Sequence, residues 1–157
     1  MRKTKADQLT DVVLTLFQLN GALVDWGDAF VAPEGLTSAR WQMLGALALA
    51  GQPLTAPQVG ARMGVSRQGA QKQLHLLAQS GLIEVRANPQ HKRSPLHALT
   101  APGLRIYDAI AQRWQARAQG LAAPFSAEEL RTTAQVLSAL LALHAPAGGA
   151  PESTDEA

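Results

Sequence analysis

The chain has 157 residues, 46% of them hydrophobic, and a formal net charge of +2 at pH 7. This length is typical of one domain, which can bury about 68 to 70% of its unfolded surface and needs neither disulfides nor metals for stability. The absence of cysteine excludes disulfide frameworks, thiolate metal sites and cysteine nucleophiles. No apolar run reaches the roughly 18 residues of a membrane span, and no signal-peptide region is visible. We therefore expect a cytoplasmic protein without a cofactor or membrane contact.

Positive charge gathers in the middle of the chain. Residues 60–95 contain six Lys or Arg and one Glu, a net charge of +5, whereas residues 1–35 carry −2 and residues 144–157 carry −3. A basic centre between acidic ends indicates a polyanionic partner, because the distribution of charge creates the local field. A solvated charged face without a partner is the alternative interpretation.

The N-terminal part predicts two longer helices. Apolar residues recur every three to four positions between residues 11 and 30, which is typical of a helix with one buried face. Residues 33–35 break this pattern, and Thr37 or Ser38 then offers an N-cap for a second helix. That helix should end near Gly51.

The next two helices are short and joined by a glycine. Thr55 and Gln58 form a capping box at the start of the first, which Gly64 should end in a left-handed turn. Ser66 is an N-cap for the second, which runs to about Ser80. The residues that helical spacing turns inward are Ala70, Leu74 and Leu77.

These two helices and the segment after them predict a winged helix-turn-helix. Residues 82–87 and 95–99 are typical of strands, and residues 88–94 form the basic tip of a wing. In this plan the second helix enters the major groove, where its polar side chains meet base edges and phosphates. We therefore predict double-stranded DNA as a partner. The predicted DNA-binding residues are Ser66, Arg67, Gln68, Gln71, Lys72 and His75 on the helix and His91, Lys92 and Arg93 on the wing.

The C-terminal part predicts two more helices and a tail. Thr100 caps a fifth helix, with Pro102 in its first turn, where the missing amide hydrogen costs nothing. Ser126 and Glu129 form a second capping box at the start of a sixth helix. Residues 144–157 have too little apolar surface to order, so we expect a disordered acidic tail.

The succession of these segments resembles the multiple antibiotic resistance regulator (MarR) family. The matching segments are LTSARWQML (36–44), LTAPQVGARMGVSRQ (54–68), LAQSGLIEV (77–85) and LTAPG (99–103). The resemblance covers roughly residues 10–143. It implies a homodimer in which the first, fifth and sixth helices interleave, and a repressor that releases DNA when a small aromatic ligand binds between the dimer and DNA-binding regions.

The wing departs from the family's Asp-x-Arg-x-x-Arg pattern. The matching positions hold Asn88, Gln90 and Arg93, so only the last arginine is kept. The amide at the first position can cap the turn but carries no charge. We expect Arg93, and then Lys92, to contact a groove or phosphate, and Gly69 to let DNA approach the helix closely.

Catalysis and metal binding are not predicted. The histidines form no His-x-x-x-His pair, and the nearest two, His91 and His97, have no Asp, Glu or Cys close by in the sequence. Ser66 is explained as an N-cap, and no glycine-flanked nucleophilic serine or phosphate-binding glycine loop is present. We therefore expect no enzyme activity.

Three aromatic residues are candidates for an effector pocket. Trp26, Phe30 and Trp41 could line a cavity between the first two helices, where the resemblance implies an effector; ordinary core packing is the alternative. The apolar faces of the first and sixth helices exceed what one small core covers. A homodimer interface explains them better than a membrane surface, for which a basic polar face is expected.

Together these features predict a mainly α fold with a short β-hairpin wing, flanked by N- and C-terminal dimerisation helices. We expect a basic extension at 1–10 and one regulator domain at 11–143, with a DNA-binding lobe at about 36–99 (the winged lobe) and dimerisation helices at about 11–31 and 100–143. The predicted function is a homodimeric, ligand-responsive repressor that binds a pseudo-palindromic operator. A winged-helix protein-interaction module without specific DNA binding is the alternative, and a small-molecule carrier is a third interpretation.

Overall fold

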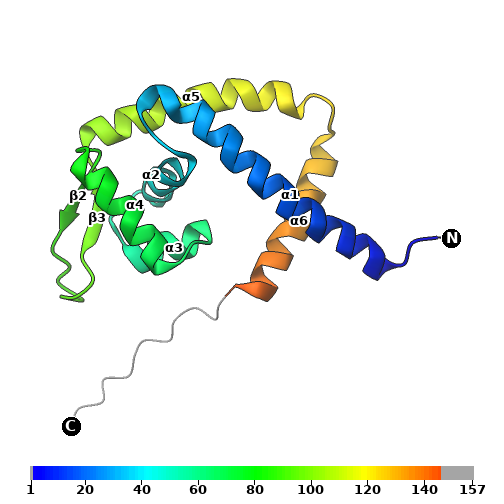
Figure 1. Ribbon diagram of the computed structural model, residues 1–157, viewed down its shortest axis with the longest axis horizontal. Coiled ribbons are helices and arrows are strands. Elements are labelled where there is room, and N and C mark those ends of the chain that lie inside the picture. Colours follow the sequence, from blue (N-terminus) through cyan, green and yellow to red (C-terminus); the bar gives the residue numbers. More distant parts are fainter. Residues whose placement is uncertain (1, 146–157) are drawn as a thin grey trace, which may run out of the picture. The chain divides into compact units, whose positions relative to one another are not determined.

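The computed structural model describes residues 2–145 and is mostly helical, with one small sheet (Figure 1). The chain forms two compact units, Met1–Ala111 and Gln112–Ala157, and helix α5 contributes to both. The helices are α1 (Lys5–Val31), the 3-10 turn η1 (Ala32–Glu34), α2 (Ser38–Ala50), α3 (Ala56–Met63), α4 (Arg67–Gln79), α5 (Ala101–Ala122) and α6 (Ala127–His144). The strands are β1 (Leu54–Thr55), β2 (Ile83–Arg86) and β3 (Leu96–Leu99).

The core of the first unit gathers where α2, α3 and α4 pack against one another. The residues predicted to face inward on α4, Ala70, Leu74 and Leu77, are all 0% exposed. Each fully buried large apolar side chain contributes roughly 1.5–3 kcal/mol of hydrophobic free energy. The largest fully buried side chains are Met43, Leu44, Leu74, Leu77, Ile110, Val31 and Val59.

The ends of the helices follow the local chemistry that the sequence predicts. Thr37 caps α2 by accepting a hydrogen bond from the Arg40 amide. The capping box of Thr55 and Gln58 is present at α3, which ends at Gly64 with a positive φ of 66°. The predicted caps of α2 and α3 are therefore confirmed, and the predominance of helix confirms the mainly α fold.

The sheet contains one strand more than the predicted hairpin. Strands β2 and β3 pair antiparallel with Val85 opposite His97, and the short strand β1 adds to the other edge of β3, with Leu54 opposite His97. The sequence did not predict β1, because two residues are too few to leave a period-two pattern. This strand links the start of α3 to the base of the wing.

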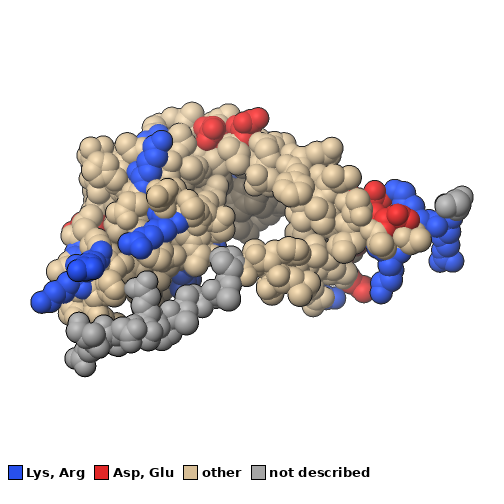
Figure 2. Space-filling view, turned by 60° about the horizontal axis from the view of Figure 1, so that its bottom comes forward, with Lys and Arg blue, Asp and Glu red and all other residues tan. Residues whose placement is uncertain are grey.

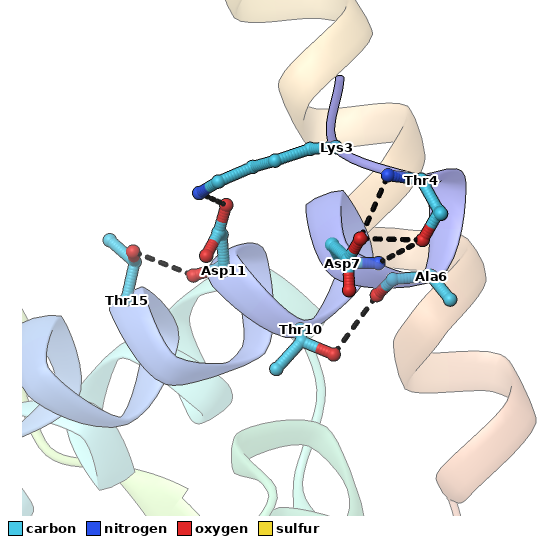
Figure 3. A network of polar contacts seen from close by, with 7 residues as sticks. All are labelled: Lys3, Thr4, Ala6, Asp7, Thr10, Asp11 and Thr15. Atoms are coloured by element: carbon cyan, nitrogen blue, oxygen red, sulfur yellow. Dashed lines mark hydrogen bonds and ion pairs between the residues drawn. The ribbon is translucent and has the colours of Figure 1, made fainter. Parts of the chain in front are cut away.

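Helix α1 begins at Lys5, earlier than the predicted start near residue 11. Thr4 is its N-cap, and Figure 3 shows the reciprocal bonds: the Asp7 amide donates to Thr4 Oγ1 (3.1 Å), and the Thr4 amide donates to Asp7 Oδ2 (2.8 Å). The Thr4 hydroxyl and amide lower the pKa of Asp7 by stabilising its charged form. An ion pair joins Lys3, which precedes the helix, to Asp11 within it (2.6 Å). Most of the predicted extension is therefore helical.

The second unit contains the end of α5 and all of α6. Ser126 and Glu129 form the predicted capping box, and this contact with Ser126 lowers the pKa of Glu129. None of the residues of α6 is buried, and four of its large apolar side chains are exposed: Leu130, Val136, Leu141 and Leu143. Of the predicted acidic tail, residues 146–157 lie outside the described residues.

Candidate nucleic-acid interface

Helix α4 presents a polar face to solvent while its opposite face fills the core. Ser66 fixes the start of the helix, because its Oγ accepts a hydrogen bond from the Gly69 amide (3.0 Å). The buried Ala70, Leu74 and Leu77 hold the rotation of the helix about its axis. The exposed side chains that border one shallow hollow on the surface are Arg67, Gln68, Gln71, Lys72 and His75.

The joint between α3 and α4 depends on close backbone contact. The Val65 amide donates to the Gly60 carbonyl (3.0 Å), which closes the turn after α3. A Cβ added to Gly60 would lie 2.8 Å from the Val65 carbonyl oxygen, so a larger residue would push the turn away from α3. The need for glycine at position 60 could not be predicted, because nothing in the local sequence pattern shows which backbone approaches it.

The wing places its basic tip in solvent. Residues 87–95 connect β2 to β3, and His91, Lys92 and Arg93 at the tip are all exposed. At the base of the loop, Asn88 Nδ2 donates to the Ser94 carbonyl (2.9 Å), and Asn88 Oδ1 accepts from the Gln90 amide (3.1 Å). The predicted turn-capping role of Asn88 is therefore present in the structure.

The basic residues of α4 and of the wing tip form no ion pair within residues 2–145. In the described part of the chain, Arg86 is paired with Glu84 on the same strand, whereas no ion pair forms at Arg67, Lys72 or Arg93. Figure 2 shows Lys and Arg side chains spread over the end of the surface that carries the wing in Figure 1, with few Asp or Glu among them. The positive charge on α4 and the wing tip creates a local field that favours an anionic partner.

The three aromatic residues predicted for an effector pocket lie together. Trp26 and Phe30 of α1 stack with their ring centres 4.7 Å apart, and Phe30 and Trp41 of α2 are tilted at 5.5 Å. All three are half-buried. Beside them, the Ser38 amide at the start of α2 donates to Asp28 Oδ1 (2.6 Å), which ties α2 to α1.

Comparison with known proteins adds sequence and fold relationships to this geometry. A model of the MarR family matches residues 34–94. A crystal structure of a MarR family transcription regulator is 32% identical and superimposes with a TM-score of 0.74, covering 88% of this chain and 91% of that one. The chain belongs to the MarR family.

Two further relatives extend this comparison. An uncharacterised protein of Mycobacterium tuberculosis is 42% identical over 108 residues, which is 69% of this chain and 74% of that protein. A mutant MarR from E. coli, crystallised in complex with operator DNA, shares the fold at 21% identity, with a TM-score of 0.73 and coverage of 88% of this chain and 99% of that one. MarR proteins are transcription regulators, and this chain has their winged-helix fold.

The MarR fold brings the predicted residues into three places: the exposed face of α4, the tip of the wing, and the aromatic group between α1 and α2. Gly69 is half-buried, and a Cβ added there would lie 3.1 Å from Ser66 Oγ, which is tight. An alanine at Gly69 would therefore crowd the N-cap of α4.

One histidine lies in the interior of the MarR domain. His97 on β3 is 3% exposed, and its Nδ1 lies 3.3 Å from the Leu54 carbonyl of β1. Burial lowers the pKa of His97 because it disfavours the charged ring, and the contact with Leu54 has a smaller, opposite effect. The His97 side chain therefore adds a contact with β1 to the backbone pairing of β1 and β3.

Residues 2–145 contain no candidate metal cluster and no candidate membrane-spanning helix. No cluster of three or more His, Cys, Asp or Glu within this range could hold a metal ion. No helix in the same range is long and apolar enough to cross a membrane.

Proposed function

We propose that this MarR-family protein is a homodimeric repressor that binds double-stranded DNA at a specific operator. The observation that carries the proposal is the division of α4 into a fully buried apolar face and an exposed polar face. Packing in the core explains the apolar face, whereas the polar face is free to contact another molecule. A helix held from beneath in this way presents its side chains at a fixed angle to the major groove.

The side chains on the exposed face of α4 have separate roles in this proposal. Arg67 lies in the first turn, and its guanidinium can make a bidentate contact with guanine O6 and N7. Gln68 and Gln71 can pair with adenine N6 and N7. Lys72 contacts phosphate, and Ser66 and His75 lie at the two ends of the same face.

The wing supplies a second set of contacts. His91, Lys92 and Arg93 reach a phosphate or groove beside the base pairs read by α4, as the exposed tip allows. Contacts of this kind fix the register of a protein on DNA without reading the sequence directly. We therefore assign affinity to the wing and discrimination between sequences to α4.

The exposed apolar residues of α1 and α6 support a homodimer. Phe17 on α1 is 74% exposed and Leu143 on α6 is 79% exposed, and such residues favour burial against a partner. A two-fold dimer presents its α4 helices to half-sites about one helical turn apart, roughly 34 Å or 10 base pairs. The operator is then a pseudo-palindrome.

The aromatic group of Trp26, Phe30 and Trp41 is the proposed effector region. It lies at the contact between α1 and α2, so a small aromatic ligand inserted there would change how the winged lobe is held. Release of DNA follows if the ligand favours the arrangement that does not fit the operator.

Selection of bound sequences from a random duplex pool tests the function. The expected result is an inverted repeat with half-sites one helical turn apart. If about six to eight phosphates are neutralised per dimer, the logarithm of affinity should fall with that of salt at a slope of about −5 to −7. A pool without enrichment, together with no binding to bulk DNA at low salt, would overturn the proposal in favour of a protein-interaction module.

A further inference from the structure

The loop at the tip of the wing is built from two consecutive turns. The His91 amide donates to the Asn88 carbonyl (3.3 Å), which closes the first turn, and the Ser94 amide donates to the His91 carbonyl (3.1 Å), which closes the second. Pro89 occupies the second position of the first turn, where its fixed φ fits. These backbone bonds shape each turn but do not join the two ends of the loop.

The side chain of Asn88 makes that connection. Its Oδ1 accepts from the Gln90 amide inside the first turn, and its Nδ2 donates across the loop to the carbonyl of Ser94. Asn88 and Ser94 are half-buried at the base, whereas the basic residues between them are exposed. One amide group therefore closes the loop beneath its charged tip.

We propose that Asn88 is a positioning residue that holds His91, Lys92 and Arg93 in the arrangement that contacts DNA. This inference rests on the proposed function. A loop closed in the free protein loses less conformational freedom when it binds, so more of the contact energy appears as affinity. Without the closure, the same side chains sample many arrangements, and the conformational entropy lost on ordering them weakens binding.

The closure requires an amide and not a carboxylate. Asn88 uses one donor and one acceptor, whereas an ionised aspartate has acceptors only. An aspartate at this position would keep the bond from the Gln90 amide but set a carboxylate oxygen against the Ser94 carbonyl. It would also add a negative charge close to Lys92 and Arg93. The departure from the acidic residue usual in the family thus has a structural use in this chain.

Two pairs of variants separate closure from charge. Asn88→Ala removes both side-chain bonds, and its matched control is Gln90→Ala, since Gln90 takes part through its main-chain amide. Asn88→Asp removes the donor and adds a charge, and Gln90→Glu adds the same charge two residues away. Binding is measured with mixed-sequence double-stranded DNA at low salt, and amide hydrogen exchange is followed by NMR in the free proteins.

The expected result is a loss of DNA affinity of about five- to tenfold for Asn88→Ala, as for one or two lost hydrogen bonds, against less than about twofold for Gln90→Ala. Asn88→Asp should lose more affinity than Gln90→Glu. The Ser94 amide, which Asn88 does not contact, should exchange faster in both Asn88 variants because the loop opens. The melting temperature should stay unchanged, since the loop lies outside the core.

Equal affinities within each matched pair, or unchanged exchange at Ser94, would overturn the role of Asn88. If the wild-type protein binds no DNA, the regulator proposal fails and the DNA role of the wing fails with it. The exchange rates would still decide whether Asn88 closes the loop, so the two failures can be told apart.

Discussion

Apolar side chains are buried in the core of the winged lobe but exposed on helix α6. In the lobe, Leu74 and Leu77 are completely buried, and the exposed residues of α4 are polar. In α6 none of the residues is buried, and Leu141 is 64% exposed. The apolar core of the winged lobe is therefore buried within a single chain. The exposed apolar side chains of α6 are instead typical of a helix that packs against another chain. This contrast favours a division of roles, in which the winged lobe folds within one chain and binds DNA, and other helices join two chains.

The largest expected effect tests the completeness of the lobe. Leu74→Ala should lower the free energy of unfolding by about 2–5 kcal/mol, because it removes a fully buried side chain and leaves a cavity beneath α4. Leu49→Ala, at a site 76% exposed on α2, should change it by less than about 0.5 kcal/mol. Urea unfolding followed by circular dichroism gives both values. Equal losses would contradict the buried core described above.

The next effect tests whether the exposed apolar residues of α1 lie in a dimer interface. Phe17→Glu should weaken dimerisation by about 2–4 kcal/mol, since it places a charge where a large apolar side chain is expected to be buried between chains. Gln18→Glu adds the same charge at the neighbouring polar position and should leave the dimer intact. Analytical ultracentrifugation over a range of concentrations measures the dissociation constants. A monomeric wild type, or dimers of equal stability in both variants, would move the interface away from Phe17.

A third prediction concerns the approach of α5 to Leu82, which lies between α4 and β2. A Cβ added to Gly103 would lie 1.9 Å from the Leu82 carbonyl oxygen, so Gly103→Ala should destabilise the fold by about 1–3 kcal/mol. Gly120, further along the same helix, has no atom within 4 Å of such a Cβ. Gly120→Ala should therefore stabilise the protein by about 0.5–1 kcal/mol. Thermal unfolding should show a lower melting temperature for Gly103→Ala and a higher one for Gly120→Ala; changes of the same sign would contradict the prediction.

Discrimination between DNA sequences gives the fourth prediction. Arg67→Ala should lose about 1–3 kcal/mol on the operator but little on scrambled DNA, because a bidentate base contact is lost. Lys72→Ala should weaken binding to both duplexes about equally, as expected for a phosphate contact. Titration of each variant against both duplexes measures the difference. Equal losses for Arg67→Ala on the two duplexes would remove it from base recognition.

Much of the fold could be predicted because its signals are local. The capping residues Thr37, Thr55 and Ser126 each accept a hydrogen bond from the amide three positions further on, so they can be predicted from short segments. The inward face of α4 follows from helical spacing alone. The start of α1 was missed because the apolar pattern begins after the capping box of Thr4, although that box is itself a local signal.

The parts that could not be predicted depend on contacts between distant segments. Strand β1 exists because Leu54 meets His97, which lies 43 positions away in the sequence. The requirement for glycine at Gly60 and Gly103 depends on carbonyl groups that only the folded chain brings close. The candidate DNA-binding residues were placed on one face by periodicity, and their contacts with bases stay a prediction.

The smallest expected effect is a dependence of stability on pH that comes from His97, which is buried in the winged lobe. Because burial lowers the pKa of His97, the unfolded chain binds a proton at this residue more readily than the folded protein does. Stability should therefore fall as the pH drops below about 6.5, the ordinary value for histidine, and should not change from this source above it. The lowered pKa values of Asp7 and Glu129 act only in more acidic solution, where carboxyl groups titrate.

Urea unfolding at intervals between about pH 7 and pH 5 isolates the contribution of His97 from those carboxyl groups. His97→Gln keeps a polar side chain opposite the Leu54 carbonyl but cannot take up a proton, so its stability should vary less over this range than that of the wild type. The absolute stability of His97→Gln should be lower, because an amide fills the space of the ring less well. If the variant and the wild type lose stability in parallel, another group is responsible, and the buried ring serves only to join β1 to β3.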